Sequence, residues 1–314
     1  MKLVAKLFKI IIFSSIFFIV LLFIFFGHRD LPLNELKAKY APTPSEFITI
    51  DGMDVHYRDE GNQMDTLPLV LIHGTSSSLH TFDAWTAALK SKKRVVRMDL
   101  PGFGLTGPFT DRPYSIDNYI LFIEQFLKSK DIKKCVLGGN SLGGLIAWQF
   151  TVKNPEIVEK LILIDAAGYP LESKSVPIAF TLARIPVLNQ LLTFITPRFM
   201  AKSSIENVYA DKTKVTESLV DRYFELTLRE GNRQALVDRM KIGIDTSSIH
   251  LIKNIQQPTL IMWGEEDLLI PTKSAYRFHN DLPNDTLVIL KNMGHVPMEE
   301  GPEESLAVLL PFLK

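Results

Sequence analysis

The sequence predicts an α/β fold with a mostly parallel central sheet flanked by helices. Six short, continuous apolar runs fit strands that are buried on both faces. Segments with helical spacing alternate with these runs, as the crossovers between parallel strands require. A chain of 314 residues is long enough for one large domain of this class with an insertion. The six runs end at His73, Asp99, Gly139, Asp165, Trp263 and Leu290.

The first 27 residues predict an N-terminal transmembrane anchor. Residues 10–27 carry no charge and are dominated by phenylalanine. As a helix, with a rise of about 1.5 Å per residue, this stretch nearly spans a hydrocarbon core of roughly 30 Å. The following letters, IFFGHRD, offer no small-residue cleavage site, which favours an uncleaved anchor over a secretory signal peptide.

Basic residues on the two sides of this segment predict its orientation. Three lysines and the amino terminus precede it, whereas the basic residues that follow are diluted by two acids. Because cytoplasmic flanks carry the excess of Lys and Arg, we expect the N-terminus in the cytoplasm and the rest of the chain on the periplasmic or extracytoplasmic side. The flanking residues are Lys2, Lys6 and Lys9 before, and Arg29, Asp30, Glu35, Lys37 and Lys39 after.

Residues 28–44 carry three prolines and no sustained period, and they predict a linker lying along the membrane face. Next, FITI at 47–50 and MDVHYRDE at 53–60 flank the pair Asp51-Gly52, which predicts a β-hairpin. The α/β core is expected over residues 45–166 and 254–314.

Four segments predict the helices of the core, and a long interruption predicts an insertion. Residues 167–253 contain no convincing strand run and are predicted as a helical cap. Its stretch 176–200 is strongly apolar, which fits either a lid over an acyl pocket or ordinary packing of cap on core. The helical segments are LHTFDAWTAALK, SIDNYILFIEQFLKS, LGGLIAWQF and ESLAVLLPFL, the last interrupted by Pro311 near its end.

Composition excludes several classes of function. The chain has 35 basic and 35 acidic residues, so no global field would recruit nucleic acid. Its single cysteine, Cys135, excludes both an intramolecular disulfide and a multi-thiolate metal site. Since Cys135 lies inside an apolar run, it is interpreted as a small core residue.

The stretch GGNSLGG at 138–144 places a hydroxyl among glycines where a strand gives way to a helix. In a strand–turn–helix elbow the central residue is strained, so the positions two before and two after must be nearly bare. Gly139 and Gly143 meet that demand, and Gly144 lets the new helix pack closely on the sheet. Ser141 is therefore the candidate nucleophile.

Ligands of such sheets bind at the carboxyl ends of the strands. His73, Gly74 and Thr75 follow one strand, and a backbone N–H there can face the elbow. We assign the N–H groups of Thr75 and Leu142 to an oxyanion hole and interpret His73 as a packing residue. The loop DLPGFG at 99–104 is interpreted as architecture.

An acid and a histidine complete the pattern. Asp267 follows a strand and precedes the strand that leads to His295, which lies between the last strand and the last helix. Asp165 is the competing acid, but the order Ser141, Asp267, His295 matches the chain order nucleophile, acid, base. We therefore expect Asp267 to orient the imidazole of His295.

From about residue 47 to the end, the chain resembles the α/β-hydrolase superfamily. The motifs that carry the resemblance are HGTSSS at 73–78, DLPGFG, GGNSLGG, WGEEDLLIP at 263–271 and GHVPMEE at 294–300. Within it the chain is most similar to microbial lipases and esterases, membrane-anchored monoacylglycerol lipases, and hydrolases that cleave carbon–carbon bonds of ring-fission products. The resemblance implies that Ser141, Asp267 and His295 form a triad and that residues 167–253 form the cap.

The resemblance implies acyl transfer from a small-molecule or lipid-like ester to water, with no metal or organic cofactor. Serine at position 141 separates the chain from relatives with an aspartate nucleophile, the haloalkane dehalogenases and epoxide hydrolases. Asn140 with Gly143 and Gly144 is familiar in the carbon–carbon hydrolases, although many of those have tryptophan where this chain has Val296. Esters are thus favoured, and a carbon–carbon hydrolase of diketones, an acyltransferase and a non-catalytic binding module stay open as alternatives. The sequence does not indicate the oligomeric state.

Overall fold

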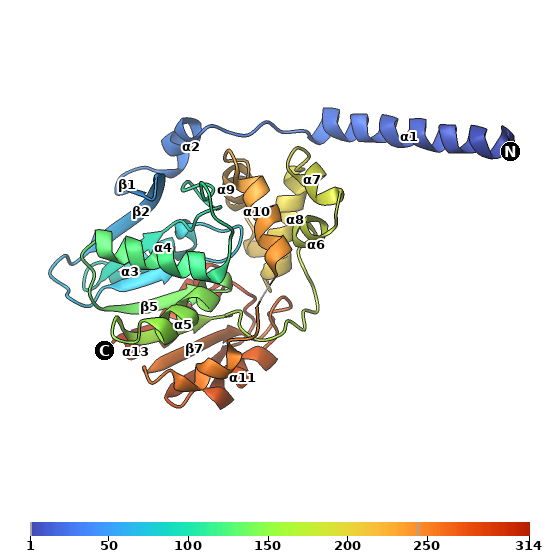
Figure 1. The fold of residues 1–314 in the computed structure, drawn as a ribbon. Helices are drawn as coiled ribbons and strands as arrows, with labels where there is room; N and C mark the ends of the chain where they lie inside the picture. The colour runs from blue at the N-terminus through green and yellow to red at the C-terminus, as the bar shows by residue number, and fades with distance from the viewer. Residues whose placement is uncertain (1, 244) are drawn as a thin grey trace.

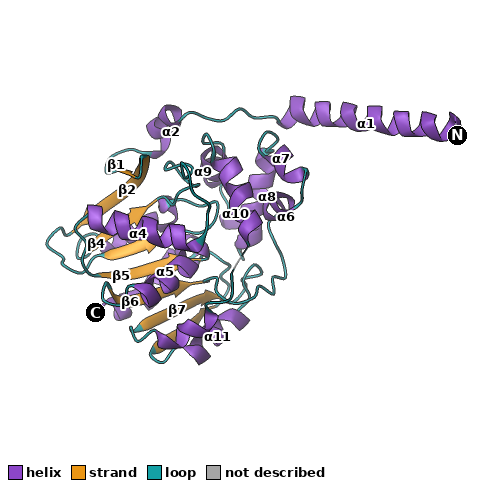
Figure 2. Cartoon of the chain, in the orientation of Figure 1, coloured by secondary structure: helices purple, strands orange, loops and turns teal. Residues whose placement is uncertain are grey.

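The computed structural model describes residues 2–243 and 245–314, apart from the side chains at positions 2, 3, 5, 15, 16 and 19. A helix at the N-terminus projects from a body in which helices flank a central sheet, and a group of further helices lies at one end of that body (Figure 1). Figure 2 shows the sheet between its layers of helices.

The strands are β1 (Glu46–Ile50), β2 (Met53–Gly61), β3 (Leu69–Ile72), β4 (Arg94–Met98), β5 (Cys135–Asn140), β6 (Val158–Ile164), β7 (Thr259–Gly264) and β8 (Asp285–Leu290). The helices before the cap are α1 (Lys2–Phe26), α2 (Leu33–Tyr40), α3 (Asp83–Leu89), α4 (Ile116–Ser129) and α5 (Leu142–Lys153). The cap holds α6 (Ile178–Arg184), α7 (Leu188–Leu192), α8 (Arg198–Val208), α9 (Glu217–Thr227) and α10 (Asn232–Ile242). After it come α11 (Lys273–Asp281), α12 (Pro297–Glu300) and α13 (Pro302–Leu313).

The strands form one sheet in the order β1-β2-β4-β3-β5-β6-β7-β8. Strand β2 pairs antiparallel with β1 and β4, and every other pairing is parallel, which confirms the predicted mostly parallel sheet. The predicted hairpin is also present, with Ile50 opposite Met53. Its two turn residues, Asp51 and Gly52, both have positive φ, as a tight turn between twisted strands requires.

The central strands β3, β5 and β7 are buried along their whole length, as expected for strands covered on both faces. Two apolar clusters account for this, one including residues of α4, α5 and α11 and the other residues of α3 and α13. Cys135 lies in the first cluster, and burial raises the pKa of its thiol to about 12. This cysteine is therefore a core residue, as interpreted from the sequence.

The cap connects β6 to β7, and its described residues contain no strand. Within the cap, α6 contacts α7, α8 and α10, and α8 contacts α9. Cap residues such as Phe180 and Leu236 line a cavity together with the core residue Ser141. The cap therefore lies over the carboxyl ends of the parallel strands.

Helix α1 runs away from the body (Figure 1). It begins at Lys2 and so includes the lysines that were expected to precede an apolar span. Among the described residues, no helix combines the length and the apolarity of a membrane span. The prediction of a transmembrane helix at 1–27 is therefore not supported by the structure.

The segment expected to be a linker, residues 28–44, contains helix α2 and packs on the body. Leu36 and Tyr40, four residues apart on one face of α2, are buried against Leu105 and Leu226. The Tyr40 hydroxyl also donates to Glu225 of α9 at 2.8 Å. The sequence did not predict this helix, because prolines stand on both sides of it and its apolar face consists of only two residues.

The glycines around Ser141 are fixed by close contacts of the backbone. A Cβ at Gly139 would collide with the carbonyl of Gly143, and one at Gly143 would collide with the carbonyl of Ile72. A Cβ at Gly144 would lie 2.5 Å from the Cβ of Ala166. The start of α5 can approach the sheet this closely only without side chains.

Gly144→Ala tests this packing through the sign of its effect. In an open helix the change would stabilise by up to about 1 kcal/mol, because alanine is the better helix former. Here we expect overpacking to dominate and to lower the free energy of unfolding by about 1–3 kcal/mol. Urea unfolding measures the difference, and a more stable variant would show that the space beside Ala166 is not limiting.

Candidate active site

Ser141 lies at the turn between β5 and α5 with φ 56° and ψ −114°. A positive φ strains any residue with a side chain, so the surrounding structure must enforce it. The Ser141 N–H donates to the carbonyl of Ile164 at 3.0 Å, and its own carbonyl accepts from Leu145 and Ala167, each at 3.0 Å. The hydroxyl is thereby held above the carboxyl ends of the strands.

His295 and Asp267 form a buried hydrogen-bonded pair. The Nδ1 of His295 lies 2.7 Å from Oδ2 of Asp267. The other oxygen, Oδ1, accepts from the N–H groups of Leu269 at 2.8 Å and Ile270 at 3.0 Å. These two N–H groups hold the carboxylate in place, and the carboxylate in turn fixes the orientation of the imidazole.

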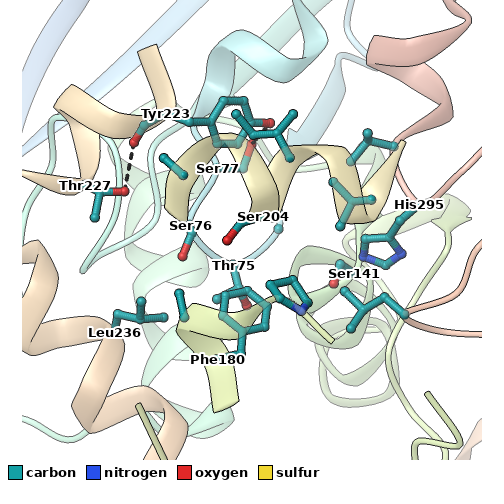
Figure 3. Close-up of a pocket in the computed structure, with 18 of the residues that line it drawn as sticks. Thr75, Ser76, Ser77, Ser141, Phe180, Ser204, Tyr223, Thr227, Leu236 and His295 are labelled. Atoms are coloured by element: carbon teal, nitrogen blue, oxygen red, sulfur yellow. Dashed lines mark hydrogen bonds between the residues drawn. The ribbon is translucent and has the colours of Figure 1, made fainter. Parts of the chain in front are cut away.

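The second ring nitrogen of His295, Nε2, is buried and has no hydrogen-bond partner among the described residues. When Nδ1 donates to Asp267, Nε2 carries the lone pair and can accept a proton. His295 and Ser141 line the same cavity, which has a volume of about 110 Å³, and Figure 3 shows the two side chains beside each other. No hydrogen bond joins the Ser141 hydroxyl to this nitrogen, and hydrogen bonds between a nucleophile and its base are often long or poorly aligned until substrate binds.

The predicted oxyanion donors, Thr75 and Leu142, also lie beside Ser141. Both residues line a second cavity together with Ser141. Neither backbone N–H donates a hydrogen bond to another described group. A Cβ at Gly74 would lie 3.1 Å from the Cβ of Ser141, so the absence of a side chain there lets the Thr75 turn approach the elbow closely. Leu142 is the first residue of α5, where the helix dipole favours negative charge.

Three further residues, whose roles were missed from the sequence, hold the loop of His295. The amide of Asn140 donates to the carbonyls of His295 at 2.9 Å and Ile164 at 3.1 Å. Glu300, which is buried, accepts from the N–H of Gly294 at 2.7 Å. The N–H of His295 donates to the carbonyl of Val208 in the cap at 2.8 Å. Only Asn140, next to the nucleophile, gave any sequence signal, because the other contacts join segments far apart in the chain.

Asp165, the competing acid, makes no hydrogen bond with His295. Its Oδ1 accepts from the N–H of Gly264 at 2.9 Å. Burial first, and then the neighbouring charge of Asp267, raise the pKa of the Asp165 carboxyl well above its ordinary value. The raised pKa favours the protonated form of Asp165, which does not repel the charge of Asp267.

The same side chains are the candidates for a metal site. Ligand atoms of Asp165, Asp267 and His295 lie within 4.8 Å of one another, all from buried residues. Asp267 already accepts three hydrogen bonds, one from His295 and two from the backbone. A cation would have to displace these bonds, so the donors present fit a hydrogen-bonded acid–base pair better than a metal centre.

The motif residues assigned to architecture have that role. His73 is fully buried, its Nδ1 lies 2.7 Å from the carbonyl of Gly74, and its Nε2 accepts from the N–H of Leu100 at 2.9 Å. Asp99 of the DLPGFG loop accepts from the N–H groups of Leu79 at 2.7 Å and Leu105 at 2.8 Å. Both residues fasten loops beside the sheet and neither lines a described cavity at Ser141.

Asp165→Asn tests the neutral state of this buried acid. An unfolded Asp ionises near pH 4, whereas the native carboxyl keeps its proton to higher pH, so the wild type loses stability as pH rises from about 4 toward the native pKa. Asparagine cannot ionise, so we expect the variant to gain stability relative to wild type across this window. Urea unfolding between pH 4.5 and 7.5 measures the difference, with the exposed Asp131→Asn as control. If the difference in free energy of unfolding between Asp165→Asn and wild type did not change with pH, Asp165 would be ionised in the native protein.

Comparisons with known proteins agree with this architecture. The chain is 29% identical over 277 residues to the uncharacterized hydrolase YugF of Bacillus subtilis (strain 168), covering 87% of this chain and 99% of that protein. It is 26% identical over 278 residues to a 2-hydroxy-6-oxo-6-(2'-aminophenyl)hexa-2,4-dienoic acid hydrolase of Metapseudomonas resinovorans, covering 85% and 90% of the two chains. The crystal structure of a putative lipase from Acinetobacter baumannii AYE superposes with a TM-score of 0.73 at 26% identity, covering 90% of this chain and 94% of that one.

The family model described as alpha/beta hydrolase fold matches residues 68–302, which include the Ser141 elbow, Asp267 and His295. With the sheet order, the cap insertion and this match in agreement, the chain belongs to the α/β-hydrolase family and is a hydrolase of that fold.

Proposed function

We propose that this hydrolase cleaves carboxylic esters through an acyl-enzyme formed on Ser141. The observation that carries the proposal is the hydrogen bonding and burial of the two ring nitrogens of His295. Its imidazole is held through Nδ1 by Asp267, and its unpaired Nε2 is buried beside the cavity that contains the Ser141 hydroxyl. A base in this position can take the hydroxyl proton as the oxygen attacks a carbonyl carbon.

Acylation follows from these positions. Nε2 of His295 accepts the proton of Ser141, and the resulting imidazolium is stabilised by the carboxylate of Asp267. The N–H groups of Thr75 and Leu142 stabilise the oxyanion that develops on the substrate. His295 then gives the proton to the departing alcohol oxygen, and the acyl group stays on Ser141.

Deacylation repeats the chemistry with water as nucleophile. His295 takes a proton from the water, the same two N–H groups stabilise the second oxyanion, and Ser141 leaves with the proton returned by His295. Every proton transfer uses side chains of this protein, so the proposed reaction requires no metal or organic cofactor.

Cleavage of a carbon–carbon bond is the second candidate, and two observations favour it. The relative from Metapseudomonas resinovorans is described as a dienoic acid hydrolase. Asn140 before Ser141, with the pair Gly143 and Gly144 after it, is also similar to hydrolases of ring-fission products. Val296 after His295 argues for esters. Comparing turnover of an ester with that of a vinylogous diketone, with and without an alcohol acceptor, separates hydrolysis of either bond from acyl transfer.

The proposed substrates are lipid-like esters supplied by a membrane surface. The end of α1 and the segment that follows it contact the cap. The N–H of Thr196 donates to the carbonyl of Phe26 at 3.2 Å, and Arg233 pairs with Asp30 at 2.6 Å. Exposed apolar side chains cover both elements. They include Phe13, Phe17 and Ile24 on α1 and Val187, Phe194 and Phe199 on the cap. A bilayer that receives α1, with the N-terminus on the cytoplasmic side, would thus lie next to the cap.

Ser141→Ala is expected to lower kcat for a p-nitrophenyl ester by roughly 10³-fold or more, because no other group can form the acyl-enzyme. The exposed serine of the cap, Ser203, provides the matched control Ser203→Ala. A fluorophosphonate probe should label the wild type and the control but not Ser141→Ala. Undiminished hydrolysis by purified Ser141→Ala would refute the assignment of the nucleophile.

Membrane association is tested by placing lysine at Phe13, Phe17 and Ile24 together. A lysine near the centre of a membrane-inserted helix, as at Phe13 and Phe17, opposes insertion by about 2.5–3.5 kcal/mol, so we expect the protein to move from the membrane fraction to the supernatant. The control places lysine at three exposed apolar positions of the body, Met64, Leu121 and Tyr276. Equal sedimentation of the two triple variants with membranes would contradict the role of α1.

A further inference from the structure

Two cavities meet at Ser141. The smaller, of about 110 Å³, is lined by Ser141, His295 and both apolar and hydroxyl-bearing residues of the cap. The larger, of about 300 Å³, shares Thr75, Ser141, Phe180 and Leu269 with the first but is not lined by His295. A substrate whose carbonyl group lies at Ser141 can therefore extend into both cavities.

The larger cavity is lined by two arginines of the cap. Arg239 of α10 is only 5% exposed, and Arg184 ends α6 at the surface. One terminal nitrogen of Arg239 donates to the carbonyl of Gly243 at 2.7 Å, whereas its Nε is buried without a hydrogen-bond partner. Within the described part of the chain, neither arginine forms an ion pair with a carboxylate.

Among the described residues, the other buried arginines are paired with carboxylates. The guanidinium of Arg97 binds Glu60 and Asp83, and that of Arg233 binds Asp30. A buried guanidinium without an anion is costly, and a second cation beside it adds to the cost. Burial and then the charge of Arg184 accordingly lower the pKa of Arg239, although a guanidinium keeps its proton in proteins. An anion supplied by a ligand would remove this cost.

We propose that the larger cavity is a binding site for the anionic end of the substrate, a carboxylate or a phosphate held by Arg239 and Arg184. The inference rests on the proposed ester hydrolysis and adds a substrate class to it. Guanidinium groups present paired N–H donors that match the oxygens of either anion.

The geometry places this anion on the acyl side of the ester. The leaving oxygen must lie next to His295, which protonates it, so the alcohol part occupies the smaller cavity. The acyl part then enters the larger cavity, where Leu145, Val176 and Met240 line an apolar path beside the arginines. The substrate is thus an ester whose acyl chain carries a negative charge at its far end.

The test compares three p-nitrophenyl esters with eight-carbon or similar acyl chains: octanoate, the monoester of suberate, and the ester of a phosphonate-terminated heptanoate. All three esters release p-nitrophenol. The ratio of kcat/KM for an anionic ester to that for octanoate therefore measures the effect of the group at the far end of the acyl chain. Higher kcat/KM with the carboxylate or with the phosphonate distinguishes the two anions.

Arg184→Glu tests the charge without disturbing a buried group. We expect it to lower the ratio of kcat/KM for the preferred anionic ester over octanoate at least tenfold, and to raise turnover of the ester of 8-aminooctanoate. Lys241→Glu is the matched control, because Lys241 lies on α10, is exposed and lines neither cavity. Arg239→Met should lower the same ratio if the variant folds.

Three outcomes decide the inference. A ratio that falls in Arg184→Glu but not in Lys241→Glu supports it. Equal ratios in wild type, Arg184→Glu and Lys241→Glu overturn it, while Ser141-dependent hydrolysis of octanoate leaves the proposed function standing. No hydrolysis of any ester by wild type, with a diketone cleaved instead, would overturn the proposed function and with it the assignment of the acyl side.

Discussion

The strained turn at Ser141 is the constraint on which the rest of the site depends. A positive φ at a residue with a side chain persists only where neighbours enforce it. Here the backbone hydrogen bonds of Ser141 hold the turn, and Gly139 and Gly143 leave room for it. The same turn begins α5, so it fixes the N–H of Leu142 beside the hydroxyl. It also brings Asn140 to the point where its amide bridges β6 and the loop of His295. One local conformation thus positions a nucleophile, a hydrogen-bond donor and the support of the base.

Electrostatics around Asp267 complete this arrangement. Two backbone N–H groups and one imidazole satisfy its oxygens, and the adjacent Asp165 is kept neutral by burial and by the charge of Asp267 itself. Two carboxylates this close would repel each other, and the raised pKa of Asp165 relieves this repulsion by favouring its protonated form. The acid that contacts the histidine is therefore also the one whose charge the surroundings stabilise.

Sequence reasoning predicted the parts of the molecule that follow from local pattern. Continuous apolar runs predicted the buried strands, the pair Asp51-Gly52 predicted the hairpin, and the glycine spacing predicted the elbow at Ser141. Contacts between segments that lie far apart in the chain leave no such pattern in the sequence. Helix α2 was missed because only Leu36 and Tyr40 form its apolar face, and the supports of the histidine loop, Glu300 and Val208, approach His295 only through the fold. The unpaired state of Arg239 was likewise invisible, since a sequence does not show which charges have partners. The apolar N-terminal stretch did become a helix, but its composition alone did not establish a span.

The hydrogen bond from the His295 N–H to the carbonyl of Val208 has a consequence for the way this enzyme type can diversify. Val208 ends the cap helix α8, so the base is attached to the same insertion whose other helices shape the two cavities. A substitution that shifts α8 to admit a different substrate would therefore also displace the imidazole of His295. Selectivity and reactivity are thus linked through α8 in this protein. A new pocket can be built most freely on α6 and α10, which make no such hydrogen bond to the loop of His295 among the described residues.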